Sequence, residues 1–263
     1  MPWFRITLAT IAIIGLGLLT LPIAALTWRA IHARDAFANP RTRDILLDAM
    51  VLSATTSAIS LAVIVVIGTP IAFTLARSDR RWARIVDALI DLPIILPPAV
   101  AGIALLAAFG RRGILGAWLD DMGISIGFST TAVMIAQIFV AAPFFIRTAR
   151  AGFLRVDRVL EEAAADLGAS PFRVFWRVTL PLCRGSLMAG AILAWARALG
   201  EFGATIMFAG NRQGVTQTMP LAIYERFGAG DLNAAITLSA VLLGASVIFL
   251  IVVRLLGESG SPR

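Results

Sequence analysis

The chain has 263 residues, of which 59% are hydrophobic and 15% charged, and its mean hydropathy is +0.86. A soluble domain has about 45–50% apolar and about 25% charged residues, so this composition excludes a soluble globular domain and a disordered segment. All 23 basic residues are arginine, which excludes chemistry that needs a lysine, such as a Walker A phosphate loop or a Schiff base. The single cysteine excludes a disulfide within the chain and a cysteine zinc cage, and the single histidine leaves little for a multi-histidine metal site.

The formal net charge of +7 is spread along the chain in a way that is typical of membrane proteins. The arginines lie between long apolar runs, whereas proteins that bind nucleic acid concentrate basic residues on one water-exposed face. We therefore expect a lipid bilayer, and no nucleic acid, as a partner.

Six stretches are long and apolar enough to cross a bilayer, which takes about 20 apolar residues. In chain order, the predicted crossings are about 6–28, 51–76, 90–110, 129–148, 184–208 and 234–254. A cleaved signal peptide is the alternative for the first, but its apolar run is too long and no clear cleavage site follows, so we expect a retained helix. The sequence thus predicts an all-α, multi-pass membrane protein with six transmembrane helices.

The placement of the arginines orients these spans. With the N-terminus inside, the inner segments hold 14 arginines, the outer loops hold 8, and Arg197 lies within a span. Because cytoplasmic loops carry the excess of basic residues, both termini are predicted to be cytoplasmic. The loop between the first two spans weakens this prediction, since its four arginines fall on the outer side.

The inner loop between the fourth and fifth spans predicts two short helices at the cytoplasmic membrane surface. Apolar residues at helical spacing form one face over residues 159–167. Gly168 is placed to end this helix in the left-handed conformation, while Ser170 and Pro171 are placed to cap and begin the next. Pro181 is expected to break the chain again. Amphipathicity alone would favour an interfacial helix that rests among lipid headgroups.

The spacing within this loop resembles the EAA motif of ABC importer permeases. The matching residues are Glu162, Ala163, Ala164, Gly168, Val178, Leu180 and Pro181, with Val178 standing where isoleucine is common. In that family the loop forms a coupling helix, which docks into a groove on the ATPase subunit. The resemblance therefore implies an ATPase-coupling role for Glu162, Ala163, Ala164, Gly168, Leu180 and Pro181.

Other segments are similar to the sulfate and molybdate permeases of this family. They are residues 91–102, with the sequence DLPIILPPAVAG, residues 197–205 continuing to 208–211, and residues 216–224, which favour the molybdate branch. The likeness covers roughly residues 45–254.

The resemblance implies the type I ABC importer transmembrane fold. Residues 1–44 would form an N-terminal transmembrane helix and the first outer loop. Residues 45–254 would form the ABC transmembrane type-1 domain, with its coupling loop at 157–181, and residues 255–263 a short cytoplasmic tail.

The resemblance also implies a permease subunit in the prokaryotic cytoplasmic (inner) membrane, which imports a tetrahedral oxyanion by alternating access. Molybdate is the expected cargo, with tungstate and sulfate as alternatives. The implied partners are a second copy of the chain, two cytoplasmic ATPase subunits that bind ATP and Mg, and an extracytoplasmic binding protein. The permease itself would be a transport subunit rather than an enzyme, with no cofactor or metal of its own.

Ionisable residues within a span are candidates for function, because burying them in lipid is costly. Arg197 and Glu201 are four residues apart, so on one helix they would share a face and pair, with Thr205 one turn further on. Gly200 and Gly203 would allow a neighbouring helix to approach closely. The pair could simply stabilise subunit packing; the alternative that we favour is a gate on the anion pathway.

The prolines at the start of the third span are further candidates for the pathway. Pro93, Pro97 and Pro98 remove backbone donors and kink a helix. Irregular backbone at membrane depth is tolerated where it is buried in protein or lines water. We therefore expect this span, and Pro97 and Pro98 in particular, to face the pathway or the dimer axis, a plain kink being the alternative.

Two other classes of membrane protein would need different residues. An intramembrane protease needs a Ser–His or Asp–Asp constellation or metal ligands within its spans, but His32 lies outside them and Asp91 is the only further acidic candidate, at a span edge. An ion-driven secondary transporter would need a coupling-ion site and no partner ATPase. The inner-loop motif argues against both.

Overall fold

The computed structural model describes residues 2–33, 39–78 and 80–258, and within these ranges it is helical with no strand, as predicted. The elements are α1 (Pro2–His32), α3 (Pro40–Ala76), α4 (Arg81–Ile95), α5 (Pro98–Phe109), α6 (Gly116–Asp121), α7 (Thr130–Leu154), α8 (Arg158–Asp166), α9 (Pro171–Val174), the π-helical turn η1 (Phe175–Thr179), α10 (Leu180–Leu199), α11 (Gly203–Phe208), α12 (Met219–Gly228) and α13 (Leu232–Glu258). Five helical segments of the described chain are long and apolar enough to cross a membrane, and α4 with α5 gives a sixth crossing if the bent pair is counted as one.

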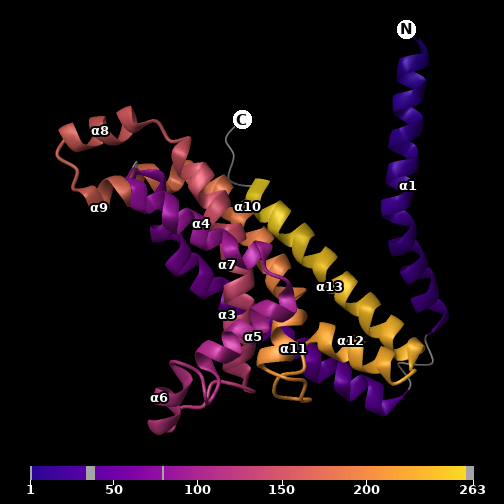
Figure 1. The fold of residues 1–263 in the computed structure, drawn as a ribbon. Helices are drawn as coiled ribbons and strands as arrows, with labels where there is room; N and C mark the ends of the chain where they lie inside the picture. The colour runs from indigo at the N-terminus through magenta and orange to yellow at the C-terminus, as the bar shows by residue number, and fades with distance from the viewer. Residues whose placement is uncertain (1, 34–38, 79, 259–263) are drawn as a thin grey trace.

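The centre of the fold is a bundle of α3, α7 and α10 (Figure 1). Small residues bring these helices together, as is usual where lipid removes the hydrophobic drive for association. A Cβ atom at Gly68 of α3 would lie 2.7 Å from the ring of Phe145, and one at Gly190 of α10 would lie 3.2 Å from the carbonyl oxygen of Phe145. Phe145 of α7 is therefore in close contact with α3 through Gly68 and with α10 through Gly190.

A buried polar group also joins α3 to α7. The Ser60 hydroxyl donates to Gln137 Oε1 (2.9 Å), and Gln137 Nε2 donates to Thr56 Oγ1 (3.2 Å). All three side chains are buried within the bundle. They satisfy one another, so this group serves packing rather than ligand binding.

The third predicted crossing, residues 90–110, is not one continuous helix. α4 ends at Ile95, Leu96 is extended, and α5 starts at Pro98, with an angle of 117° between the two helices. Pro97 and Pro98 cause this break, because neither has an N–H to donate and a proline disfavours the helical conformation in the residue before it. Pro93 lies inside α4 and does not end it.

The fifth predicted crossing, residues 184–208, is also wrong at its outer end. α10 ends at Leu199 and the chain resumes as the short helix α11 at Gly203. The intervening residues leave the helical path, and the Glu201 side chain accepts the backbone N–H of Ala204 in the first turn of α11 (2.7 Å). The carboxylate thereby starts a new helix instead of continuing the old one.

The predicted break at Pro181 does not occur. Residues 171–199 form one helical segment, with the wide turn η1 just before the proline. In that turn the Leu180 N–H donates to the carbonyl of Phe175, five residues back. A π-helical turn loosens the ladder of hydrogen bonds, which lets the helix pass a residue that cannot donate.

The two ends of the molecule are distinct. Figure 1 shows α8 and α9, the start of α1 and the end of α13 at one end, with α6 and the α11–α12 region at the other. The start of α1 and the end of α13 thus lie at the same end as the inner loop, and that this end is cytoplasmic stays a prediction. α1 diverges from the bundle, and its apolar span buries no residue within the chain. α3 begins at Pro40, so the predicted boundary between residues 44 and 45 falls inside a helix.

Candidate functional site

The inner loop adopts the two short helices that the sequence predicts. The Asp157 side chain caps α8 by accepting a backbone N–H (3.0 Å), and Gly168 ends the turn after α8 with a φ of +83°. That left-handed conformation is open to glycine at little cost. The Ser170 hydroxyl caps α9, and Pro171 is the first residue of α9. Local sequence therefore fixes the shape of this loop.

The outer surface of the loop is free. No residue of α8 is buried, and its predicted apolar face is exposed at Val159 (62%), Leu160 (48%) and the adjoining Leu167 (90%). Of the residues assigned to ATPase coupling by resemblance, the exposed ones are Glu162, Ala163, Gly168 and Pro181, and the half-buried ones are Ala164 and Leu180. An apolar face of this kind, rimmed by charge, marks a surface for a partner or for lipid.

One contact that ties this loop to the bundle was missed by the sequence analysis. Glu161 Oε1 accepts hydrogen bonds from Arg77 Nη2 and from Thr179 Oγ1, each at 2.6 Å. Arg77 follows the last residue of α3, and Thr179 is the last residue of η1. The only available signal was an extra glutamate beside the motif, and its partners are far away in the sequence.

The second group of candidate residues lies where α10 ends. Arg197 Nη1 and Glu201 Oε2 form the expected ion pair at 2.6 Å, although Glu201 is outside the helix. The Glu201 side chain is 1% exposed and that of Arg197 is 30% exposed. With the second carboxylate oxygen held by the N–H of Ala204, Glu201 fixes both the end of α10 and the start of α11.

The expectation that Thr205 continues the helix face of Arg197 and Glu201 is wrong, because α10 ends at Leu199 and α11 starts only at Gly203. Thr205 lies in α11, is fully buried, and its hydroxyl has no hydrogen-bond partner. An unsatisfied buried hydroxyl is unusual and costs free energy.

α11 packs directly on α5, so the structure brings the two sets of predicted pathway residues together. A Cβ atom at Gly203 would lie 2.4 Å from Pro98 Cβ, and one at Gly102 would lie 2.7 Å from the carbonyl oxygen of Ala204. Gly203 therefore has the predicted role in close approach, whereas Gly200 meets only its own helix. Pro97 is exposed at the bend before α5. We call this contact of α5, α11 and the end of α10 the α5–α11 junction.

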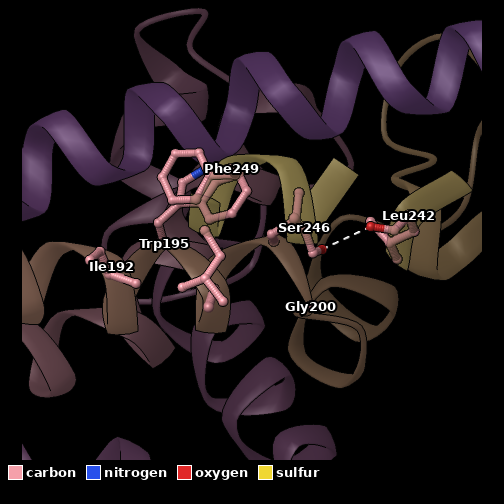
Figure 2. A pocket seen from close by; sticks show the side chains of 9 residues that line it. Ile192, Trp195, Gly200, Leu242, Ser246 and Phe249 are labelled. Carbon is pink, nitrogen blue, oxygen red and sulfur yellow. Dashed lines mark hydrogen bonds between the residues drawn. The ribbon is translucent and has the colours of Figure 1, made fainter. Parts of the chain in front are cut away.

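A cavity of about 260 Å³ lies beside the junction, between α10 and α13 (Figure 2). Trp195 stacks on Phe249 along it, with ring centroids 3.4 Å apart. Its one hydroxyl, that of Ser246, donates to the carbonyl of Leu242 in the same helix (2.8 Å). Apart from that hydroxyl and the indole N–H of Trp195, the lining side chains are apolar, and none is charged, so the cavity lacks the cationic group that would mark it as an anion site.

The fold, the exposed inner loop and the tight junction of bent helices define a multi-pass membrane protein of the transport class. The chain belongs to the family described as binding-protein-dependent transport system inner membrane component, whose sequence profile matches residues 65–259. Members of this family are transport components.

Relatives along nearly the whole chain are permeases for oxyanions or for molybdenum. The molybdenum transport system permease protein ModB of Mycobacterium tuberculosis is 44% identical over 240 residues, covering 90% of this chain and 89% of the relative. A probable molybdenum ABC transporter permease of Haloferax volcanii is 36% identical over 257 residues, covering 98% and 91%. The sulfate transport system permease protein CysT of Synechocystis is 34% identical over 244 residues, covering 92% and 85%.

Solved structures agree in fold. A chain of a bacterial ABC transporter that imports the acidic polysaccharide alginate superposes with a TM-score of 0.74 at 15% identity, covering 98% of this chain and 95% of that chain. A chain of the MetNI methionine ABC transporter in an inward-facing conformation gives a TM-score of 0.64 at 20% identity, covering 85% and 100%. These likenesses establish the type I ABC importer transmembrane fold.

Proposed function

We propose that this chain is the permease subunit of an ATP-driven molybdate importer of the prokaryotic cytoplasmic membrane. The observation that carries the proposal is the 44% identity, over 90% of the chain, to a molybdenum transport permease. Sulfate is the second candidate cargo, because a sulfate permease is 34% identical over 92% of the chain.

Import of such an anion needs an energy source. Moving a dianion into a negative cell costs roughly 4–5 kcal/mol at 100 mV, since each charge costs about 2.3 kcal/mol. The chain has no lysine and so cannot build a Walker A loop. Two cytoplasmic ATPase subunits would bind ATP and Mg and supply this energy.

The exposed face of α8 is the proposed docking surface for the ATPase. It presents Val159, Leu160 and Leu167, together with the exposed Glu162. Closure of the ATPase dimer on ATP would displace α8, and the helical bundle would rock between inward-open and outward-open states. A second copy of the chain would complete the translocation pathway.

The α5–α11 junction is the proposed gate. Glycines bring α5 and α11 into direct contact there. Glu201 neutralises Arg197 (2.6 Å) and accepts the N–H of Ala204, so it holds the end of α10 to the start of α11 and leaves no free positive charge on Arg197 to trap an anion. Pro97, Pro98 and Thr205 would move with these helices. An anion that binds weakly along such a route can also leave it, so selectivity would reside mainly in an extracytoplasmic binding protein.

The test is uptake of labelled molybdate into proteoliposomes that contain the permease, its ATPase partner and the binding protein. We expect uptake to require ATP and the binding protein, to persist when ionophores collapse ion gradients, and to be inhibited by tungstate more than by sulfate. Uptake that follows an ion gradient without ATP would overturn the proposal in favour of a secondary transporter. Preferential inhibition by sulfate would reassign the cargo.

A second measurement addresses the gate. Glu201→Ala is expected to change uptake or the coupling of uptake to ATP hydrolysis, because it removes both the ion pair and the cap of α11. Wild-type values of both quantities would contradict a gating role for this pair.

A further inference from the structure

Two adjacent glutamates on α8 are in opposite environments. Glu162, which belongs to the EAA-like motif, is exposed and makes no ion pair in the described part of the chain. Glu161 has a side chain only 17% exposed and is bonded to two residues of other elements. Consecutive residues of a helix point about 100° apart, so one helix can present a charge to a partner and turn the next charge inward.

The contacts of Glu161 converge on a single atom. Its Oε1 accepts from both Arg77 Nη2 and Thr179 Oγ1 at 2.6 Å. Arg77 is itself held in place, because its backbone N–H donates to Phe73 and its guanidinium lies 5.7 Å from the centroid of the Phe73 ring. Thr179 is 1% exposed. Charge-assisted hydrogen bonds of this length are among the stronger polar contacts in a protein.

These contacts connect α8 to α3 and to α10, and α10 leads to the proposed gate. Arg77 stands at the end of α3, and Thr179 directly precedes α10, whose far end carries Arg197. α8 buries no residue of its own, so apolar packing does not fix it to the bundle. A helix held so loosely could be displaced by a partner without moving the membrane helices, unless a polar contact ties it to them.

We propose that Glu161 is a positioning residue that anchors α8 to α3 and α10, so that displacement of the loop is passed to the membrane helices. Glu162 and the apolar face meet the partner, while Glu161 holds the loop to its own chain. This inference rests on the proposed ATPase-coupling function and adds a residue outside the motif by which that function was recognised.

The test compares two single charge neutralisations on α8 in the reconstituted complex of permease, ATPase and binding protein. Glu161→Gln is expected to leave the amount of co-purified ATPase within about twofold of wild type and to keep ATP hydrolysis. Molybdate uptake per ATP hydrolysed is expected to fall about tenfold or more, because the amide keeps an acceptor oxygen but loses the charge that strengthens both hydrogen bonds. Asp166→Asn makes the same charge change on the exposed side of α8, one turn from Glu162, and is expected to keep the wild-type uptake per ATP hydrolysed, whatever its effect on the amount of co-purified ATPase.

Uptake per ATP unchanged in Glu161→Gln, with the wild-type complex active, would overturn the anchor. A wild-type permease that neither retains an ATPase nor shows ATP-driven uptake would instead overturn the proposed function, so the two failures are distinguishable. If Glu161→Gln does not elute as a monodisperse protein, Thr179→Val carries the test, because it removes one bond to Glu161 and leaves the ion pair. It is expected to lower uptake per ATP severalfold, and a wild-type ratio would likewise overturn the proposal.

Charge exchange separates an anchor from a general effect on folding. In Arg77→Glu/Glu161→Arg the ion pair can form in the reverse sense, so uptake per ATP is expected to recover at least severalfold over either single variant. No recovery, in a double variant that elutes normally and still retains the ATPase, would contradict the proposed role of the pair.

Discussion

The coupling loop and the α5–α11 junction hold helices together by different kinds of contact. At the coupling loop, caps and one ion pair define the position of α8, which buries no side chain. At the junction, glycines bring two helices into direct contact around a carboxylate that is 1% exposed. The first arrangement leaves the surface of α8 free for a partner that binds and dissociates, whereas the second packs α5 and α11 closely against each other. An ATP-driven transporter needs both a surface on which its ATPase can act and a contact between membrane helices that this action can separate.

The largest expected effect is at the junction, from Arg197→Ala. This variant leaves the buried Glu201 carboxylate without its cation, and breaking a buried pair in this way costs about 3–5 kcal/mol of unfolding free energy. Glu201→Ala should cost less, because the Arg197 side chain is 30% exposed and can turn toward water. Thermal unfolding in detergent would measure the difference. Equal losses, or a larger loss from Glu201→Ala, would show that the buried carboxylate is not the sensitive partner.

Gly203→Ala tests whether close packing seals the junction. The new methyl group would meet Pro98 at 2.4 Å, and overpacking of this kind costs about 1–3 kcal/mol. We expect a lower unfolding temperature and reduced uptake. Gly185→Ala is the matched control, since nothing lies within 4 Å of a Cβ atom there and alanine favours the helix by up to about 1 kcal/mol. If both variants behave alike, the α5–α11 contact is looser than described.

Gly168→Ala tests the coupling loop in the opposite way. With φ at +83°, a Cβ atom adds roughly 1–2 kcal/mol of local strain, which is relieved by changing the angle between α8 and α9. Because α8 buries nothing, we expect the unfolding temperature to stay near the wild-type value while the co-purified ATPase falls about fivefold or more. A large drop in unfolding temperature without loss of ATPase would show that the coupling loop stabilises the fold and does not bind the partner, contrary to the difference proposed between the loop and the junction.

The smallest expected effect is from Ser60→Ala in the α3–α7 bundle. It removes the donor to Gln137 Oε1, and hydrogen bonds between membrane helices contribute on average about 0.6 kcal/mol. Comparing its loss of unfolding free energy with that of Gly203→Ala tests whether hydrogen bonds or close packing contribute more to the stability of the membrane helices. A loss larger than that of Gly203→Ala would favour the polar bonds.

Local patterns predicted the coupling loop well. Gly168, Ser170 and Pro171 act through neighbours within a few residues, so the turn and the second cap were derived from spacing alone, whereas the Asp157 cap of α8 was found only in the structure. The junction could be predicted only in part. The sequence identified Arg197, Glu201 and Pro98 as candidates, but an assumed continuous helix placed Thr205 on the wrong face, because nothing local indicated that Glu201 would cap a new helix.

Composition, apolar runs and arginine placement were sufficient to identify a multi-pass helical membrane protein, because lipid imposes length and polarity on each span regardless of how the spans pack. The spacing of Glu162 to Pro181 was sufficient for the family. Only the tertiary structure decided that α11 packs on α5 and that Glu161 turns inward to Arg77. Each of these depends on which distant residue supplies the partner, and hydrogen bonding and close packing are settled between helices rather than along them.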